Sequence, residues 1–281
     1  MTLEGKILFD EMTWREIKDA VRQQRVVLVP MGTVEQHGHH LPLCVDNLIV
    51  GEVCKKAAEL IPNEALVMPH LSYGYNEHHK DFPGTIFVDA DHLIAHGFDV
   101  CRSVAYHGFR KIVIVNGHGS NGPFAQIIAR EVTNKTEAIC AAVDWWNLSK
   151  DTAARLRESE APGGMAHACE LETSLLLYLR PDLVQMDKAQ KDMNFQKSNY
   201  IWWDLIGASV GGKVSFMDYF SRMSKTGTMG DPTKATLQKG KEVFEATVKE
   251  LAAFCKEFRA REIRKRVDHH GPEDPAAFSD W

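Results

Sequence analysis

The chain has 281 residues, of which 44% are hydrophobic and 25% are charged, and its formal net charge is −5. This composition is typical of a globular protein with a sizeable core. The mildly acidic balance argues against nucleic acid as the main partner, because phosphate binding needs a concentrated basic patch. No apolar run reaches the length of about 18 residues that a membrane span requires, which argues against a membrane partner as well.

The cysteines are scattered along the chain and form no close pair in the sequence: Cys44, Cys54, Cys101, Cys140, Cys169 and Cys255. The opening segment Met1–Lys6 shows no signal-peptide pattern. We therefore expect reduced thiols and a cytoplasmic location.

Strand-like and helical segments alternate through the first half of the chain. Thr13 and Glu16 form a capping-box pattern that opens a helix through about Gln24. Short apolar runs predict strands at 26–30, 65–69, 111–115 and 138–143, and the segments between them predict helices at 47–60, 90–107 and 123–133. This alternation predicts an α/β fold with βαβ units around a parallel sheet.

The loop after the first strand, residues 35–46, concentrates side chains that bind metals. It holds two carboxylates, Glu35 and Asp46, and three imidazoles, including that of His37. Carboxylate oxygens combined with imidazole nitrogens suit Zn, Mn or Fe. The alternative is a polar loop whose histidines are merely solvated.

A second polar loop, Asn116–Gly122, directly follows the strand at 111–115 and carries His118. Its glycines would let the backbone approach a ligand closely, and its N–H groups would suit an anion or oxyanion at the start of the next helix. A simple strand-to-helix turn is the alternative. Because ligands bind at the carboxyl ends of parallel strands, we expect His118 to lie beside the metal-binding side chains of residues 35–46.

The third element is His167–Leu177, for which we predict a helix that ends near Arg180, because a proline follows. On such a helix His167 and Glu170 would share one face. Glu172 falls within the apolar stripe, where an unpaired charge is costly. It therefore needs a proton, a hydrogen-bonding partner or a metal.

The second half of the chain is less regular. Residues 187–224 are rich in aromatic side chains and predict an irregular flap or a subunit-contact segment within a single domain that spans 1–281. A long helix is predicted from Asp231 to about Arg266. The polar tail 267–281 is expected to be partly ordered at best.

Four ordered motifs make the chain resemble the creatininase (creatinine amidohydrolase) family over nearly its whole length. They are Pro30–Leu43 with Asp46, His79–Thr85, Asn116–Asn121 and His167–Ser174, and Gly227–Thr236 is a weaker match. The resemblance implies a three-layer α/β/α sandwich around a parallel sheet, two divalent metal ions per chain and hydrolysis of a non-peptide C–N bond. It also favours a homo-oligomer, for example a hexamer.

The resemblance further implies the metal ligands. Glu35 and His118 would hold one ion and His37 the other, and Asp46 would bridge the two ions. These positions match the family's motifs residue by residue.

One ligand of creatininase has no counterpart, because this chain has Ser120 where that enzyme has a glutamate. We expect Glu170 to complete the second metal site, with Glu172 as the alternative. His167 and Glu172 match the family's active-site histidine and glutamate beside the substrate.

The surroundings of the substrate also differ from those in creatininase. That enzyme has a Trp-Asp pair and a tyrosine facing creatinine, whereas this chain has glycines at the three positions, which argues against creatinine itself. The substrate contacts are expected from His79, Gly119, Ser120, Trp145 and Trp146. Core packing would explain tryptophans equally well.

Together these features predict a metal-dependent amidohydrolase for a small amide, such as a cyclic one. Two ions would lower the pKa of a bridging water, and His167 would protonate the leaving nitrogen while Glu172 orients its imidazole. Backbone N–H groups of residues 117–121 would stabilise the oxyanion. The alternatives are a formamide deformylase, a peptide-trimming hydrolase and a non-catalytic metal-binding module.

Overall fold

The structure is a computed structural model that describes residues 5–196, 198–206 and 213–270. Most of the expected polar tail, residues 271–281, lies outside the described residues. Within the described ranges, no helix is both long and apolar enough to cross a membrane.

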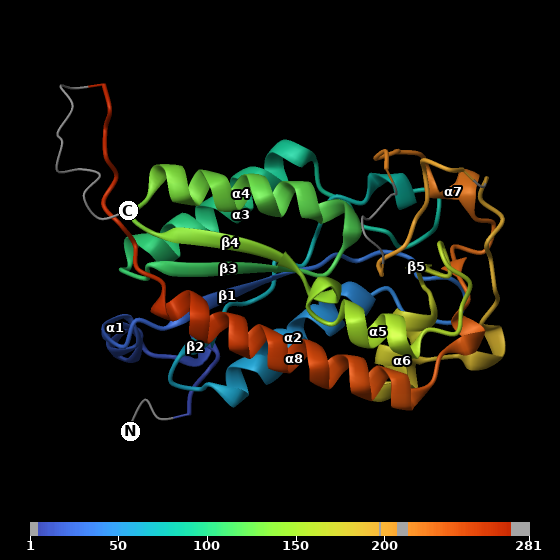
Figure 1. Cartoon of the computed structure of the whole chain (residues 1–281), viewed down its shortest axis with the longest axis horizontal. Helices are drawn as coiled ribbons and strands as arrows, with labels where there is room; N and C mark the ends of the chain where they lie inside the picture. Colours follow the sequence, from blue (N-terminus) through green and yellow to red (C-terminus); the bar gives the residue numbers. More distant parts are fainter. Residues whose placement is uncertain (1–4, 197, 207–212, 271–281) are drawn as a thin grey trace.

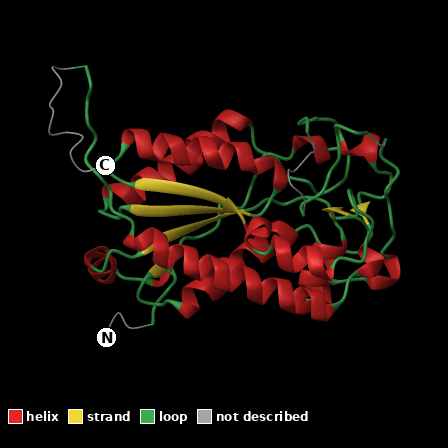
Figure 2. Ribbon diagram, viewed as in Figure 1, coloured by secondary structure: helices red, strands yellow, loops and turns green. Residues whose placement is uncertain are grey.

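A parallel four-stranded sheet forms the centre of the molecule, with the strand order β2-β1-β3-β4 (Figure 2). The strands are β1 (Val26–Met31), β2 (Ala65–Val67), β3 (Lys111–Asn116) and β4 (Ile139–Asp144). Every residue of β1 and β3 is buried, because these two strands occupy the middle of the sheet. Their nearly continuous apolar runs are typical of parallel strands that are covered on both faces.

Helices cover both faces of this sheet, so the fold is a three-layer α/β/α sandwich (Figure 1). On one face lie α3 (Ala90–Tyr106) and α4 (Gly122–Lys135), and on the other lie α2 (Val45–Leu60) and α8 (Leu237–Ala260). Successive residues of β1 alternate between the two cores. Leu28 packs with α2 and α8, whereas Val27 packs with α3 and α4. The predicted fold class is therefore confirmed.

Shorter elements complete the chain. The expected capping box opens α1 (Trp14–Arg22), with Thr13 and Glu16 bonded to each other's backbone N–H groups. Two further helices, α5 (Lys150–Leu156) and α6 (Glu170–Leu179), lie beyond the end of the sheet near α8.

Two predicted helices begin later than expected. Residues Met165–His167 form β5, which pairs with β6 (Met229–Gly230), and Ala168 has a φ of 48°, so the following helix α6 begins only at Glu170. The long C-terminal helix begins at Leu237, where Thr236 accepts a hydrogen bond from a backbone N–H of the first turn. The first correction matters for the site, because His167 lies on β5 and not on the helix that carries Glu170 and Glu172.

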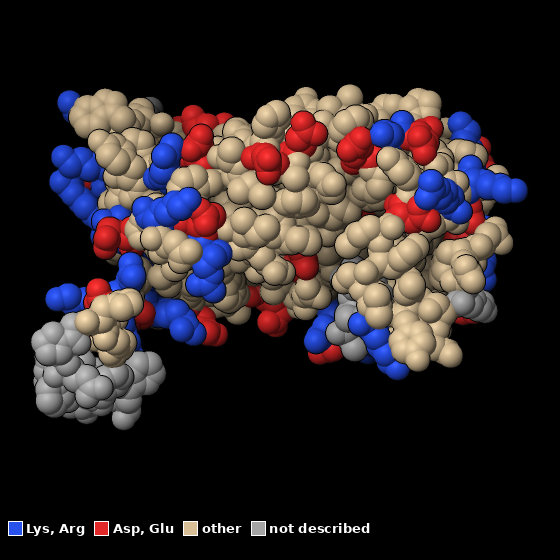
Figure 3. All heavy atoms as spheres, turned by 90° about the horizontal axis from the view of Figure 1, so that it is seen from above, with Lys and Arg blue, Asp and Glu red and all other residues tan. Residues whose placement is uncertain are grey.

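The aromatic segment 187–224 contains little regular structure in its described parts. Its one α-helix there is α7 (Phe220–Met223), which packs against the short 3₁₀ helix η2 (Glu77–His79). Figure 3 shows the face over α3 and α4, where acidic and basic side chains are mixed toward the two ends and few Lys or Arg lie in the middle.

Candidate metal centre

The first candidate ligands meet where β1 and β3 end. Glu35 and His37 lie in the loop after β1, and His118 follows β3. Met31 pairs with Asn116 at the ends of these strands, so the two loops leave the sheet side by side. Asp46 lies in the first turn of α2, where the helix dipole favours a negative charge.

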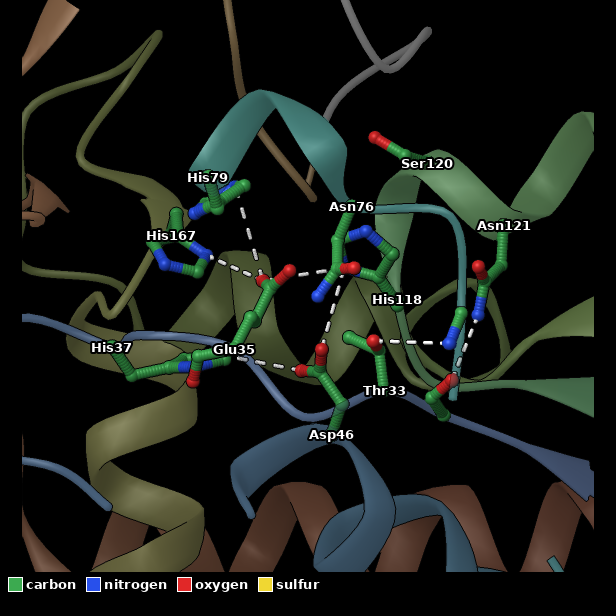
Figure 4. A network of polar contacts seen from close by, with 12 residues as sticks. Thr33, Glu35, His37, Asp46, Asn76, His79, His118, Ser120, Asn121 and His167 are labelled. Atoms are coloured by element: carbon green, nitrogen blue, oxygen red, sulfur yellow. Dashed lines mark hydrogen bonds and ion pairs between the residues drawn. The ribbon is translucent and has the colours of Figure 1, made fainter. Parts of the chain in front are cut away.

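The side chain of Asp46 lies between two imidazoles (Figure 4). Its Oδ1 is 3.3 Å from His37 Nε2, and its Oδ2 is 3.3 Å from His118 Nδ1. The same His118 nitrogen is also 3.3 Å from Glu35 Oε1. The two oxygens of one carboxylate therefore face two different histidines, an arrangement that suits a carboxylate between two metal ions.

A second group of ligand atoms surrounds His37. Its Nε2 lies 3.7 Å from Glu172 Oε1, and its ring centroid is 4.2 Å from that of His167. His167 and His79 in turn both face Glu35, with ring nitrogens 3.6 Å and 3.9 Å from Oε1. Three sets of potential ligand atoms thus adjoin one another: Glu35/Asp46/His118, His37/His167/Glu172 and Glu35/His79/His167.

The burial of these groups creates a demand for positive charge. Among the described residues, both oxygens of Glu35, Oδ2 of Asp46 and Nε2 of His37 are buried without a hydrogen-bond partner. Buried polar atoms are normally paired, and buried carboxylates bind cations or take up protons. The donor set of carboxylate oxygens and imidazole nitrogens therefore fits a divalent metal such as zinc or manganese.

The pKa values of the histidines reflect the need of the buried carboxylates for a neighbouring positive charge. Burial alone would lower the pKa of His118, but the charges of Glu35 and Asp46 outweigh it and raise the pKa to about 10. Burial likewise opposes a charge on His37, yet Asp46 and Glu172 raise its pKa well above the usual value. Without metal, protons on these imidazoles supply the charge that bound cations would provide.

The other two imidazoles are held neutral. Burial, followed by the charge of His37, lowers the pKa of His167 to about 3. Burial and the neighbouring histidines lower the pKa of His79 well below its usual value.

Phe220 from α7 covers these two rings. Its ring is stacked on His79 with a centroid distance of 4.2 Å and an interplanar angle of 23°, and it lies 4.8 Å from His167. The segment that carries Phe220 is fastened by Asp192, whose carboxylate accepts a hydrogen bond from Ser224 at 2.9 Å. Phe220 therefore covers the two imidazoles and restricts the space above them.

Comparison with known proteins places the chain in a family. The family model Creatininase, described as creatinine amidohydrolase, matches residues 10–255. The chain belongs to the creatininase family. It is 30% identical to creatinine amidohydrolase of Pseudomonas putida over 91% of this chain and 98% of that protein. It is 32% identical to the mycofactocin precursor peptide peptidase of Mycolicibacterium smegmatis over 83% of this chain and 85% of that protein.

Solved creatininases share the fold. One described as Zn-Zn type superimposes with a TM-score of 0.77 at 30% identity, covering 91% of this chain and 99% of the other. A second, described as creatininase Mn, has the same TM-score and identity and is covered completely. The family model and these likenesses identify the protein as a creatininase-family amidohydrolase.

Glu170 does not occupy the place in the creatininase-family site that the sequence suggested. Its carboxylate accepts hydrogen bonds from Lys239 Nζ at 2.6 Å and from the backbone N–H of Ser159 at 2.8 Å. Burial opposes ionisation of Glu170, but these hydrogen bonds outweigh it and lower the pKa of the carboxyl. Because α6 begins at Glu170 and not at His167, it is Glu172 that faces His37.

The expected substrate contacts divide into two groups. His79 lies within the ligand cluster, whereas Ser120 lies at its edge with its Oγ 3.2 Å from His78 Nε2, and Gly119 is exposed with open space around it. Trp145 and Trp146 are 1% and 2% exposed and pack in the core beneath α8. The prediction that these tryptophans line the substrate pocket is therefore not supported, since their side chains fill the core.

Two residues of the site were not predicted individually. Gln36 lies between two expected ligands in the sequence, but nothing about an isolated glutamine indicates a function. Phe220 was visible only as one of many aromatic side chains in the segment 187–224.

Proposed function

We propose that this protein hydrolyses the C–N bond of a small amide with two divalent metal ions. Glu35 and His118 would hold one ion, and His37 and Glu172 the other, with Asp46 bridging them. The observation that carries the proposal is the position of Asp46, whose two oxygens lie 3.3 Å from nitrogens of His37 and His118. Zinc or manganese is the expected metal, since solved relatives are described with each of them, and iron suits the same ligands.

When bound, such ions supply an activated water nucleophile and polarise the substrate carbonyl. The chain itself supplies the proton transfer. The ring of His167 lies 4.2 Å from that of His37, beside the second group of ligand atoms. Its Nδ1 lies 3.6 Å from Glu35 Oε1, beside the candidate ligands, so a neutral His167 would take the proton of the attacking water and deliver it to the leaving nitrogen. Glu172, expected to orient His167, is assigned here to the second ion.

The position of the Phe220 ring over His79 and His167 favours a compact substrate. The cluster lies under buried side chains, and Phe220 itself is only 5% exposed. A long peptide, as the name of the mycobacterial relative would suggest, needs an open groove above the reacting bond. We therefore favour small cyclic or linear amides, and keep the expected homo-oligomer and cytoplasmic location as predictions.

The test is metal content combined with turnover. The protein is loaded with zinc or manganese, and hydrolysis of lactams, hydantoin-like rings, formamides and creatinine is measured. We expect about two ions per chain, and we expect Asp46→Asn to lose both ions and turnover. The matched control is Asp231→Asn, a buried carboxylate outside the cluster whose capping hydrogen bond to Thr233 an amide can also make. Retention of both ions and full turnover by Asp46→Asn would disprove the proposal.

A further inference from the structure

The side chain of Gln36 lies between the imidazoles of His79 and His167. It is 6% exposed, and its amide orientation is fixed, because the backbone N–H of Gly38 donates to Oε1 at 2.9 Å. Gly227 faces the same oxygen, and a Cβ there would lie only 2.0 Å from it. A glycine at this position, with a φ of 78°, leaves room for the amide. The amide nitrogen therefore points to the two rings.

The orientation of this amide determines the tautomer of His79. An amide nitrogen can only donate a hydrogen bond, and Gln36 Nε2 lies 3.0 Å from His79 Nδ1. Nδ1 must therefore carry the lone pair. In a neutral ring the hydrogen is then on Nε2, the nitrogen that faces Glu35 Oε1 at 3.9 Å.

His167 is held in the complementary way by the backbone of the same residue. Its Nε2 lies 2.8 Å from the carbonyl oxygen of Gln36, which can only accept a hydrogen bond. Nε2 therefore carries the hydrogen, and the lone pair is on Nδ1, which faces Glu35 at 3.6 Å. The 3.2 Å approach of Gln36 Nε2 to His167 Nε2 is then a contact between two donors and contributes no bond.

We propose that Gln36 is a positioning residue that gives His79 and His167 complementary tautomers, so that His79 donates a hydrogen bond to the reacting amide and His167 accepts a proton. This assignment rests on the amidohydrolase activity proposed above. It also bears on one of the three groups of potential ligand atoms, Glu35/His79/His167. With a hydrogen on its Nε2, His79 cannot bind a metal through that atom, so Glu35/His79/His167 is not a third metal site.

The tautomers can be measured directly by NMR. In zinc-loaded protein with ¹⁵N-labelled histidine, the couplings between ring nitrogens and ring C–H groups distinguish a protonated Nε2 from a protonated Nδ1. We expect His79 to carry its hydrogen on Nε2. Gln36→Met keeps the length of the side chain but removes the donor, so His79 should become a mixture of tautomers. Turnover number should fall about 10- to 100-fold with unchanged zinc content.

Asn76→Leu is the matched control. Asn76 is another fully buried amide near His79, but its side chain donates to the carbonyl of Val34 and bonds no imidazole. This variant should leave the His79 spectrum unchanged.

Two results would overturn the assignment: a wild-type His79 protonated on Nδ1, or a Gln36→Met protein whose His79 tautomer is unaltered. Because the first result needs only the wild-type protein, a variant that fails to fold does not block the test. A wild-type protein with the expected tautomers that hydrolyses no amide would instead refute the proposed function.

Discussion

The buried ion pair of Glu170 and Lys239 allows a test of which glutamate serves the metal centre. Glu170 is fully buried, and Lys239 is 9% exposed. The Lys239 Nζ donates to Glu170 Oε1 at 2.6 Å and also lies 2.7 Å from the exposed Glu158. Lys239→Met removes this cation and leaves the Glu170 carboxylate with only backbone N–H partners from the loop before β5.

The expected cost follows from the burial of the carboxylate. Removing one partner of a buried ion pair destabilises a protein by about 3–5 kcal/mol, because the remaining charge is uncompensated. For a chain of this size, that loss should lower the melting temperature by roughly 10 °C. Metal content should not change, because Glu170 makes its contacts outside the ligand cluster.

The free energy of unfolding is measured by urea denaturation and the metal content by elemental analysis. Lys56→Met is the matched control, since Lys56 and Glu59 form a pair of the same type at 2.7 Å with both side chains substantially exposed. That variant should lose no more than about 1 kcal/mol. If Lys239→Met lost metal while keeping its stability, Glu170 would be a metal ligand after all and our assignment of Glu172 would be wrong.

Two further predictions concern pH and substrate size. Burial lowers the pKa of His40 from 6.5 to about 4, so the unfolded chain takes up the proton first and the folded state loses stability as pH falls from 6.5 toward 4. Between about pH 7 and about pH 5, the free energy of unfolding measured by urea titration should fall by about 2 kcal/mol more in the wild type than in His40→Gln. An equal dependence of this free energy on pH in the two proteins would contradict the prediction. Phe220→Ala should raise kcat/KM for a bulky amide relative to a small lactam by about tenfold, with partial return in Phe220→Leu. An unchanged ratio would show that Phe220 does not limit the site.

Much of the fold, and the proximity of Glu35 and His118, follow from local sequence patterns. The apolar runs of β1 and β3 require burial on both sides, which predicts central parallel strands. The carboxyl ends of such strands meet, so Glu35 and His118 could be placed together although they are far apart in the chain.

The errors arose where tertiary contacts decide the local structure. His167 was expected on the same helix as Glu170, but it pairs with β6 in a short strand, and a positive φ at Ala168 separates it from α6. Helix periodicity counted from His167 therefore placed Glu170 beside His167, whereas Glu172 is the glutamate that lies near His37. Glu170 had a different partner, Lys239, and no local pattern connects two residues so distant in sequence.

The candidate metal ligands and the Phe220 ring that covers them belong to parts of the chain that differ in regular structure. Glu35, His37 and His118 of the cluster follow the ends of β1 and β3, the two fully buried central strands of the sheet. Phe220 belongs to a segment with little regular structure, which is fastened through Asp192 and a few other polar contacts. We therefore expect that substitutions in the segment around Phe220 would change the cover of the site while the candidate metal ligands keep their positions. With this arrangement, proteins of the same fold would differ in the substrates they accept and still share the same reaction.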